Sequence, residues 1–393
     1  MHGISGVILL SVAESPLILI VTAAIAIAVA GLSIPVVLRI SRSCNLTDKP
    51  GPRKVHLLAV PRLGGVGIFI AFSISYSLMI NGLDAQAGYL FAALLMLFFT
   101  GITDDLIHLP ARKKLVIQVI AALVVIILAD VRFTSLHGFL GINGISPWIS
   151  VPLTLFVMIV IINALNLIDG VDGLAAFLSL TSLAAIGSWF WSRDMTGNAV
   201  IAAAMAGALI SFLYFNMSKG RNKIFMGDSG SLVIGFVISV LIIRFNEVNA
   251  QAATVNTLRS APAVSIAILI IPLFDTLRVV ILRTIRGQNP FRADKRHIHH
   301  LMLRAGYSHR QVSLILSLFQ ASAITLAFVF DGIGIIALSV IMLVVCYGLI
   351  LVITVRVRKR IRTVTMTSGD RPGERLRYVQ PLPEAPEKKV LNL

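Results

Sequence analysis

Long apolar segments alternate with short polar connections along most of the chain. Each segment is long enough, or nearly long enough, to cross the roughly 30 Å hydrocarbon core of a bilayer as a helix. The eleven segments are residues 16–40, 64–80, 86–101, 115–130, 147–165, 173–193, 197–217, 230–246, 261–281, 311–331 and 333–355. The pattern predicts an all-α polytopic membrane protein with about eleven transmembrane helices.

Composition agrees with this interpretation and excludes an ordinary soluble protein. Of the 393 residues, 57% are hydrophobic and only 13% are charged, and the mean hydropathy is +0.90. Apolar segments recur up to about residue 355, so we expect one polytopic transmembrane domain over 1–355. Residues 356–393 are basic, contain several prolines and lack apolar periodicity, which predicts a disordered cytoplasmic tail near anionic lipid headgroups.

Basic residues are distributed unevenly between alternate connections. One set of connections contains 18 Lys and Arg residues in addition to the tail, and the other set contains three. Because basic residues mark the cytoplasmic side of a membrane protein, the N-terminus is predicted outside and the C-terminus in the cytoplasm. The net charge of +16 is then explained by membrane topology, and no nucleic acid partner is expected.

Four polar clusters interrupt this apolar chain, and all of them fall in connections on the predicted cytoplasmic side. They are Thr103-Asp104-Asp105, the segment from Asn166 to Gly173, the segment from Met226 to Gly230, and the segment from His297 to His300. Ionisable groups in membrane segments are energetically costly, and those that occur usually serve a function. We therefore expect one active site on the cytoplasmic face.

The acidic clusters have both a chemical and a structural interpretation. Asp104 and Asp105 point about 100° apart if they are helical, so they are expected to serve different partners, although an acidic pair also occurs at solvated or capped helix ends. Asn166, Asp169 and Asp172 would share one stripe of a continuous helix, and a polar turn is the alternative.

The remaining clusters suggest a cation and an anion site. Asp228, with another aspartate, suits Mg²⁺ better than zinc, although Asp is also a common helix N-cap. His297, His299 and His300 follow Arg296 and other cations, a composition that suits a bound diphosphate, with a solvated basic loop as the alternative. The two cysteines are far apart, and neither a disulfide nor a thiolate metal site is expected.

In their order, these segments resemble the polyprenyl-phosphate N-acetylhexosamine-1-phosphate transferases, a group of glycosyltransferase family 4. The resemblance covers about residues 45–310. It rests on Asp104-Asp105, on Asn-Leu-Ile-Asp-Gly-Val-Asp-Gly from Asn166, on Phe-Met-Gly-Asp-Ser-Gly-Ser from Phe225, and on His-Ile-His-His from His297. It implies transfer of a sugar 1-phosphate from a UDP-N-acetylhexosamine to undecaprenyl phosphate, with release of UMP and with Mg²⁺ or Mn²⁺ as cofactor.

The resemblance also implies a role for each matching residue. Catalysis is assigned to Asp104, Asp105, Asp169 and His297, and metal binding to Asp228 and Asp169. Substrate binding is assigned to Lys54, Lys113, Asn166, Asp172, Asn216, Phe225, Arg296, His299 and His300, with Lys114 as the alternative to Lys113. The site would lie at the cytoplasmic face of a bacterial inner membrane.

The spelling His-Ile-His-His from His297 resembles the WecA branch of the family. This favours UDP-N-acetylglucosamine as donor and the initiation of a lipid-linked surface glycan such as lipopolysaccharide O-antigen. UDP-N-acetylquinovosamine, UDP-N-acetylfucosamine and UDP-N-acetylmuramoyl-pentapeptide are the alternative donors. The oligomeric state is open, with a homodimer as one arrangement.

A membrane transporter is the alternative from another functional class. It would be expected to carry ionisable residues within its spans, and Asp275 and Arg278 are the nearest example here.

Overall fold

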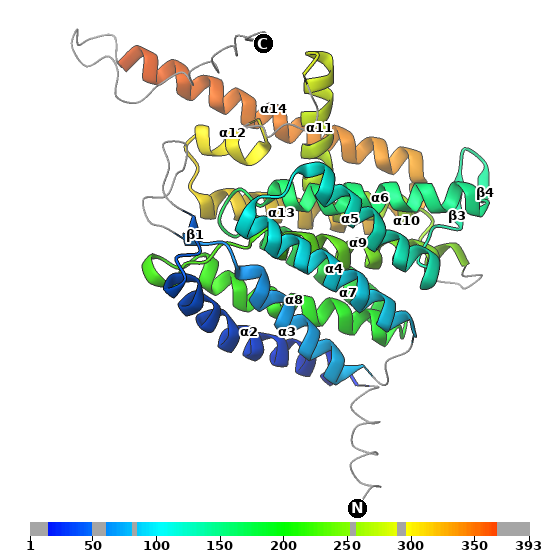
Figure 1. Ribbon diagram of the computed structural model, residues 1–393. Helices are drawn as coiled ribbons and strands as arrows, with labels where there is room; N and C mark the ends of the chain where they lie inside the picture. The colour runs from blue at the N-terminus through cyan, green and yellow to red at the C-terminus, as the bar shows by residue number, and fades with distance from the viewer. Residues whose placement is uncertain (1–14, 49–59, 81–84, 252–256, 289–295, 368–393) are drawn as a thin grey trace, which may run out of the picture.

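The structure is a computed structural model in which helices pack side by side over most of the chain (Figure 1). It describes residues 15–48, 60–80, 85–251, 257–288 and 296–367. Its α-helices are α2 (Leu17–Ser43), α3 (Gly64–Met79), α4 (Ala85–Ile107), α5 (Ala111–Leu123), α6 (Pro147–Ile168), α7 (Leu174–Trp191), α8 (Thr196–Asn216), α9 (Gly227–Gln251), α10 (Ala261–Ile268), α11 (Ile270–Ile285), α12 (Ile298–Arg304), α13 (His309–Val329) and α14 (Ile335–Thr367).

Each predicted apolar segment coincides with one helix or with two consecutive ones. Among the described residues, eight helices are long and apolar enough to cross a membrane, and a ninth crossing results if α10 and α11 form one bent span. Helix α3 is shorter, and α5 continues as a π-helical turn over Val124–Leu128. The chain is therefore a polytopic helical membrane protein, as predicted.

Two short antiparallel ribbons are a departure from the all-α prediction. Strands β1 (Thr47–Asp48) and β2 (Val60–Pro61) form one ribbon, and β3 (Ser135–Phe139) and β4 (Ile142–Gly144) form the other. The second ribbon reverses through Gly138 and Gly141, which both have positive φ angles. These segments are too short to appear as alternating patterns in the sequence.

Helices α10 and α11 meet at an angle of 82°, and α11 stands steeply against the other helices (Figure 1). Pro272 has no N–H, so it cannot donate to the Ile268 carbonyl one turn earlier. That carbonyl instead accepts a hydrogen bond of 2.8 Å from Ser182 Oγ of α7. A side chain from another helix thus compensates for the break in this predicted span.

Helix α14 continues through the first part of the predicted tail and ends at Thr367. The prediction of a disordered tail from residue 356 is therefore wrong for 356–367. Arg and Lys are good helix formers, so the change from apolar to basic residues alters what the helix contacts without ending it. Residues 368–393 lie outside the described part of the chain.

Helix α9 is the central helix of the fold and packs against α3, α4, α6 and α7. In its apolar membrane segment, 83% of the residues are buried within the protein, whereas 17% are buried in that of α14. Glycines permit a close approach at the beginning of α9: a Cβ atom on Gly101 of α4 would lie 2.3 Å from Ser229 Cα. The glycines after Arg62 likewise serve close packing, since a Cβ on Gly65 would lie 2.1 Å from Gly230 N.

The substitution Gly101→Ala is expected to destabilise the protein. The added Cβ would collide with the backbone of Ser229, and overpacking of this kind costs about 1–3 kcal/mol. Gly88→Ala is the matched control in the same helix, because no heavy atom lies within 4 Å of its added Cβ. Thermal unfolding in detergent should show a lower midpoint for Gly101→Ala only. Equal midpoints for the two variants would contradict the close contact between α4 and α9.

Candidate active site

Asp105 at the end of α4 holds the beginning of α9 in place. Its carboxylate accepts hydrogen bonds from Asp228 N at 2.8 Å, Ser229 N at 3.1 Å and Ser229 Oγ at 2.8 Å. The first N–H groups of a helix have no partner within the helix, and a carboxylate placed there satisfies them. Asp105 therefore acts as a cap supplied by a different helix.

Asp104 has a different set of partners, as the sequence predicted for adjacent helical residues. Its Oδ2 lies 3.1 Å from Lys114 Nζ, which also lies 2.6 Å from Asp228 Oδ2. Its Oδ1 accepts a hydrogen bond from Leu109 N at 2.6 Å. All three charged side chains are mostly buried but still reach solvent. Lys114 thus joins the first and third clusters of the sequence through one shared cation.

The structure brings Lys114 to these carboxylates and leaves Lys113 exposed. The choice of Lys113 as a substrate ligand therefore has no support from the geometry. The two lysines are adjacent, and only the direction of α5 relative to α4 distinguishes them. Lys54 lies outside the described residues, so its predicted role is not tested.

The second cluster is a turn between two helices, which was the alternative that the sequence left open, so its polar residues do not form one helical stripe. Helix α6 ends at Ile168, and α7 begins after Gly173, which has a φ of 77°. Of the polar residues in this cluster, Asn166 lies on α6, and its Nδ2 donates to Ser231 Oγ of α9 at 2.8 Å. Asn166, Asp169 and Asp172 therefore do not lie along one face of a continuous helix.

Asp172 contacts two nitrogen-bearing side chains from later segments of the chain. Its Oδ2 lies 2.6 Å from Lys223 Nζ and 3.2 Å from His309 Nδ1. Burial opposes ionisation, but the hydrogen bonds and charges of His309 and Lys223 hold the pKa of Asp172 below its ordinary value. Lys223 also lies 5.5 Å from the ring centre of Phe225. Neither Lys223 nor His309 was among the candidate site residues chosen from the sequence.

Asn216 is fully engaged in holding this turn. Its Oδ1 accepts a hydrogen bond from Gly173 N at 2.6 Å, and its Nδ2 donates to Ile224 O at 2.8 Å. It is 4% exposed. These contacts make it a positioning residue that joins the second and third clusters, and they leave no exposed amide face for direct binding of a nucleoside.

Asp169 is the acidic residue with the least compensated charge. Among the described residues, no donor lies within hydrogen-bond distance of its carboxylate. Burial and the negative charges of Asp228, Asp105 and Asp172 raise the pKa of Asp169 to about 7. A cation placed among these carboxylates would lower their mutual repulsion.

The histidine cluster is held by Asp275, which is 1% exposed. Asp275 Oδ2 lies 2.9 Å from His297 Nδ1, and its Oδ1 accepts from Ile298 N at 2.9 Å and from Arg278 Nη2 at 3.0 Å. Arg278 also donates to the backbone carbonyl of Arg296. These pairs explain Asp275 and Arg278 within α11 without a transport path.

His299 lies directly against the turn of the second cluster. A Cβ atom on Gly170 would lie 2.7 Å from His299 Nε2, so glycine at this position leaves room for the imidazole ring. Burial and the neighbouring His300 lower the pKa of His299 to about 3, so the ring is neutral at physiological pH. A neutral imidazole can hydrogen bond to phosphate but cannot supply the positive charge that the sequence suggested.

The four sequence clusters therefore meet in one site. Asp105 contacts Asp228, Asn166 contacts Ser231, and Gly170 contacts His299. These contacts join the end of α4, the turn after α6, the beginning of α9 and the short helix α12. Such an arrangement of carboxylates, amine and imidazoles can hold a cation together with phosphate groups.

Comparison with known proteins points to one family. Residues 87–246 match the model of glycosyl transferase family 4. The undecaprenyl-phosphate alpha-N-acetylglucosaminyl 1-phosphate transferase of Salmonella typhi is 31% identical over 291 residues, which cover 72% of this chain and 76% of that protein. The proteins of the same name from Escherichia coli strain K12 and Haemophilus influenzae are 30% and 32% identical, with 76% and 78% of their lengths covered.

The raised pKa of Asp169 predicts a pH-dependent effect of Asp169→Asn. Without divalent cations, the folded protein retains a proton that the unfolded chain releases near the ordinary pKa of 3.8. Stability is therefore lost as the pH rises from about 4 to about 7. Asn cannot ionise, so Asp169→Asn should raise the thermal unfolding midpoint relative to the wild type more at pH 8 than at pH 5.

Asp130→Asn, at a side chain that is 72% exposed, is the control for the substitution itself. An equal difference between Asp169→Asn and the wild type at both pH values would show that Asp169 is already ionised in the folded protein at pH 5.

Proposed function

The chain belongs to glycosyl transferase family 4, and on that premise we propose that it transfers N-acetylglucosamine 1-phosphate from UDP-N-acetylglucosamine to undecaprenyl phosphate. The products are UMP and a lipid diphosphate sugar. This reaction is the one that the relatives' names give. The alignment with this chain covers about three quarters of each relative's length.

One observation carries the proposal: Lys114 Nζ lies within 3.1 Å of Asp104 and 2.6 Å of Asp228. The reaction brings two phosphate anions together, so its main requirements are neutralisation of charge and alignment of the reacting groups. An ammonium group shared between two carboxylates can donate to a phosphate oxygen when a substrate displaces one of them. The arrangement suits a phosphate group that arrives and leaves in each turnover.

In the proposed reaction, an oxygen of the lipid phosphate attacks the β-phosphorus of the UDP-sugar. The new phosphorus–oxygen bond forms as the bond between the β-phosphorus and the bridging oxygen breaks, and the electron pair leaves with UMP. We assign Asp104 and Lys114 to orienting the lipid phosphate, because Asp105 is already committed to the N–H groups of α9. His297, oriented by Asp275, and His299 are assigned to phosphate oxygens of the donor.

A divalent cation such as Mg²⁺ or Mn²⁺ fits this donor set. Among the described residues, no three acidic, cysteine or histidine side chains converge closely enough to bind a metal by themselves. Mg²⁺ commonly uses only one or two carboxylates together with substrate phosphates and water. Asp228 and Asp169 are the residues proposed to hold the cation, and the unpaired carboxylate of Asp169 supports this assignment. When bound, the cation would neutralise charge on the diphosphate.

We propose that all eleven apolar segments cross a bacterial inner membrane, with the N-terminus outside and the active site on the cytoplasmic face. The uneven distribution of Lys and Arg along the chain supports this orientation. A soluble nucleotide sugar and a lipid phosphate would meet at that interface. UDP-N-acetylglucosamine is the donor named by the relatives, and the other UDP-N-acetylhexosamines are the competitors against which it is tested.

The direct test uses membranes that contain the protein, Mg²⁺, undecaprenyl phosphate and labelled UDP-N-acetylglucosamine. A lipid-soluble, acid-labile product should form together with UMP. Competition with the other UDP-N-acetylhexosamines establishes donor preference. The absence of product from every donor would reject the proposed function.

Lys114→Met should lower kcat by about 100-fold or more, because it removes the cation between Asp104 and Asp228. Lys113→Met is the matched comparison, since the adjacent exposed lysine should leave kcat within about threefold of the wild type. Steady-state kinetics on equal amounts of inserted protein would check this pair. A larger loss in Lys113→Met than in Lys114→Met would reverse the assignment of the two lysines.

A further inference from the structure

A cavity of about 430 Å³ lies between the end of α2, the end of α8 and the connection that follows α8. That volume falls within the range of about 300–1,000 Å³ that small-molecule sites occupy. Among the described residues, no acidic side chain lines the cavity, so it combines positive charge with aromatic and aliphatic groups. The lining includes Leu38, Arg39, Arg42, Tyr214, Phe215 and Asn222.

Two guanidinium groups on the wall of this cavity are available to a ligand. Arg39 and Arg42 are three positions apart on α2, so their side chains extend from neighbouring positions on one face of the helix. Among the described residues, neither guanidinium group has a hydrogen-bond or ion-pair partner. Two like charges so close together repel each other, and an anion bound between them would relieve that repulsion.

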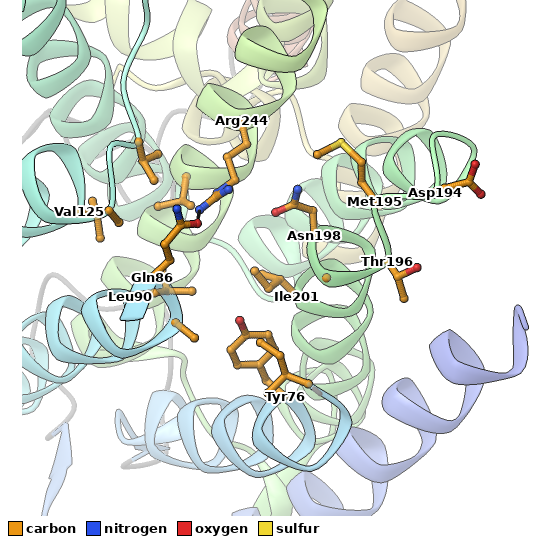
Figure 2. Close-up of a pocket in the computed structure, with 16 residues that line it drawn as sticks. Tyr76, Gln86, Leu90, Val125, Asp194, Met195, Thr196, Asn198, Ile201 and Arg244 are labelled. Carbon is orange, nitrogen blue, oxygen red and sulfur yellow. Dashed lines mark hydrogen bonds between the residues drawn. The ribbon is translucent and has the colours of Figure 1, made fainter. Parts of the chain in front are cut away.

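Another cavity with an arginine on its wall provides the contrast. This cavity of about 500 Å³ is lined by Tyr76, Gln86 and Arg244, among other residues (Figure 2). Arg244 Nη2 donates to Gln86 Oε1 at 2.9 Å, and Arg244 has a further contact within the protein. The guanidinium group of Arg244 therefore serves the internal structure, whereas no described group is paired with those of Arg39 and Arg42.

Arg39 and Arg42 lie at a boundary of the membrane. The uncharged part of α2 from Leu17 to Leu38, at about 1.5 Å per residue, spans about 33 Å. That length matches the roughly 30 Å hydrocarbon core, so the two arginines follow directly at the depth of the lipid headgroups. The boundary is the one at the candidate active site, because α8 ends beside the cavity at Asn216, which holds the turn of the second cluster.

An apolar surface continues from the cavity toward the interior of the membrane. Val36 precedes Arg39 by three residues and Ile210 precedes Tyr214 by four, so each lies one turn deeper on the same helix face. Both side chains are exposed, as is Tyr214, whose ring packs edge-on against Phe215 at a centroid distance of 5.2 Å. Tyrosine is enriched at membrane boundaries, where its ring contacts apolar groups and its hydroxyl contacts polar ones. The surface therefore offers polar and apolar contacts in the order in which a phospholipid requires them.

We propose that the cavity between α2 and α8 binds an anionic phospholipid, with its phosphate on Arg39 and Arg42 and the first part of an acyl chain along Val36 and Ile210. Guanidinium groups bind phosphate through charged hydrogen bonds that are often paired. The two positive charges favour an anionic lipid such as phosphatidylglycerol. A soluble phosphate ion would use the arginines and leave the apolar surface without a partner, so the arrangement favours a lipid.

The cavity is separate from the groups assigned to transfer. Figure 1 shows α2 on the flank of the bundle opposite α12, which follows His297 and carries the other two histidines of the cluster. The cavity nevertheless adjoins a segment of the candidate site, since Phe215 directly precedes Asn216 and Asn222 directly precedes Lys223. A bound lipid would therefore hold the end of α2 against α8 and the connection that follows it.

The test measures binding of phosphatidylglycerol to delipidated full-length protein in detergent, by native mass spectrometry and by the thermal unfolding midpoint. Arg39→Gln combined with Arg42→Gln should weaken binding about tenfold or more, because it removes the charged hydrogen bonds to the phosphate. The matched control combines Arg112→Gln with Arg286→Gln, at two exposed arginines that do not line the cavity, and lowers the net charge by the same amount. This control should bind the lipid as the wild type does.

Diacylglycerol with the same acyl chains and inorganic phosphate alone are the two ligand controls. Binding of phosphatidylglycerol to the wild type, with loss in the cavity variant only and no comparable effect of either ligand control, supports the proposal. An equal effect of diacylglycerol would overturn the phosphate contact, and an equal effect of inorganic phosphate would overturn the lipid. Unchanged binding in the cavity variant, or an equal loss in both double variants, would reject this site. Because binding is measured without donor or acceptor, the result does not depend on the proposed function.

Discussion

Asp105 accepts two backbone hydrogen bonds and one hydroxyl hydrogen bond at the beginning of α9. Asp104 directly precedes Asp105, and the backbone N–H of Asp228 donates to the Asp105 carboxylate. This contact between α4 and α9 therefore determines where Asp228 lies relative to Asp104. The approach is close because Gly101 has no side chain opposite Ser229. Without these two features, Lys114 could not lie within ion-pair distance of both Asp104 and Asp228.

Several negative charges then accumulate in a space with few compensating partners. Lys114 is shared between two carboxylates, and Lys223 and His309 are taken by Asp172. Asp169 is left with repulsion from its neighbours, which is expressed as a raised pKa. The proposed binding of a cation together with phosphate oxygens would relieve this repulsion. His299 contributes a hydrogen-bonding group and no charge, since burial keeps its ring neutral.

Helix α9 links the two polar regions of the molecule. Its first residues include Asp228 at the candidate active site, and Arg244 near its other end lines a separate cavity. Most of the helix between them is buried against neighbouring helices, which makes it a rigid element. Asp228 and Arg244, at opposite ends of α9, are thus fixed on a single helix.

The sequence by itself determined the helices and the composition of the site. Apolar segments located the described helices other than the short α12, because a membrane helix must satisfy its backbone polar groups internally. Four polar clusters stood out against so few charges. Tertiary structure decided that Lys114 and not Lys113 contacts Asp228, and that Asp275 pairs with His297. It also showed that α6 ends at Ile168. Each depends on groups far apart in the chain, whose distances follow from helix packing and leave no local periodicity to detect.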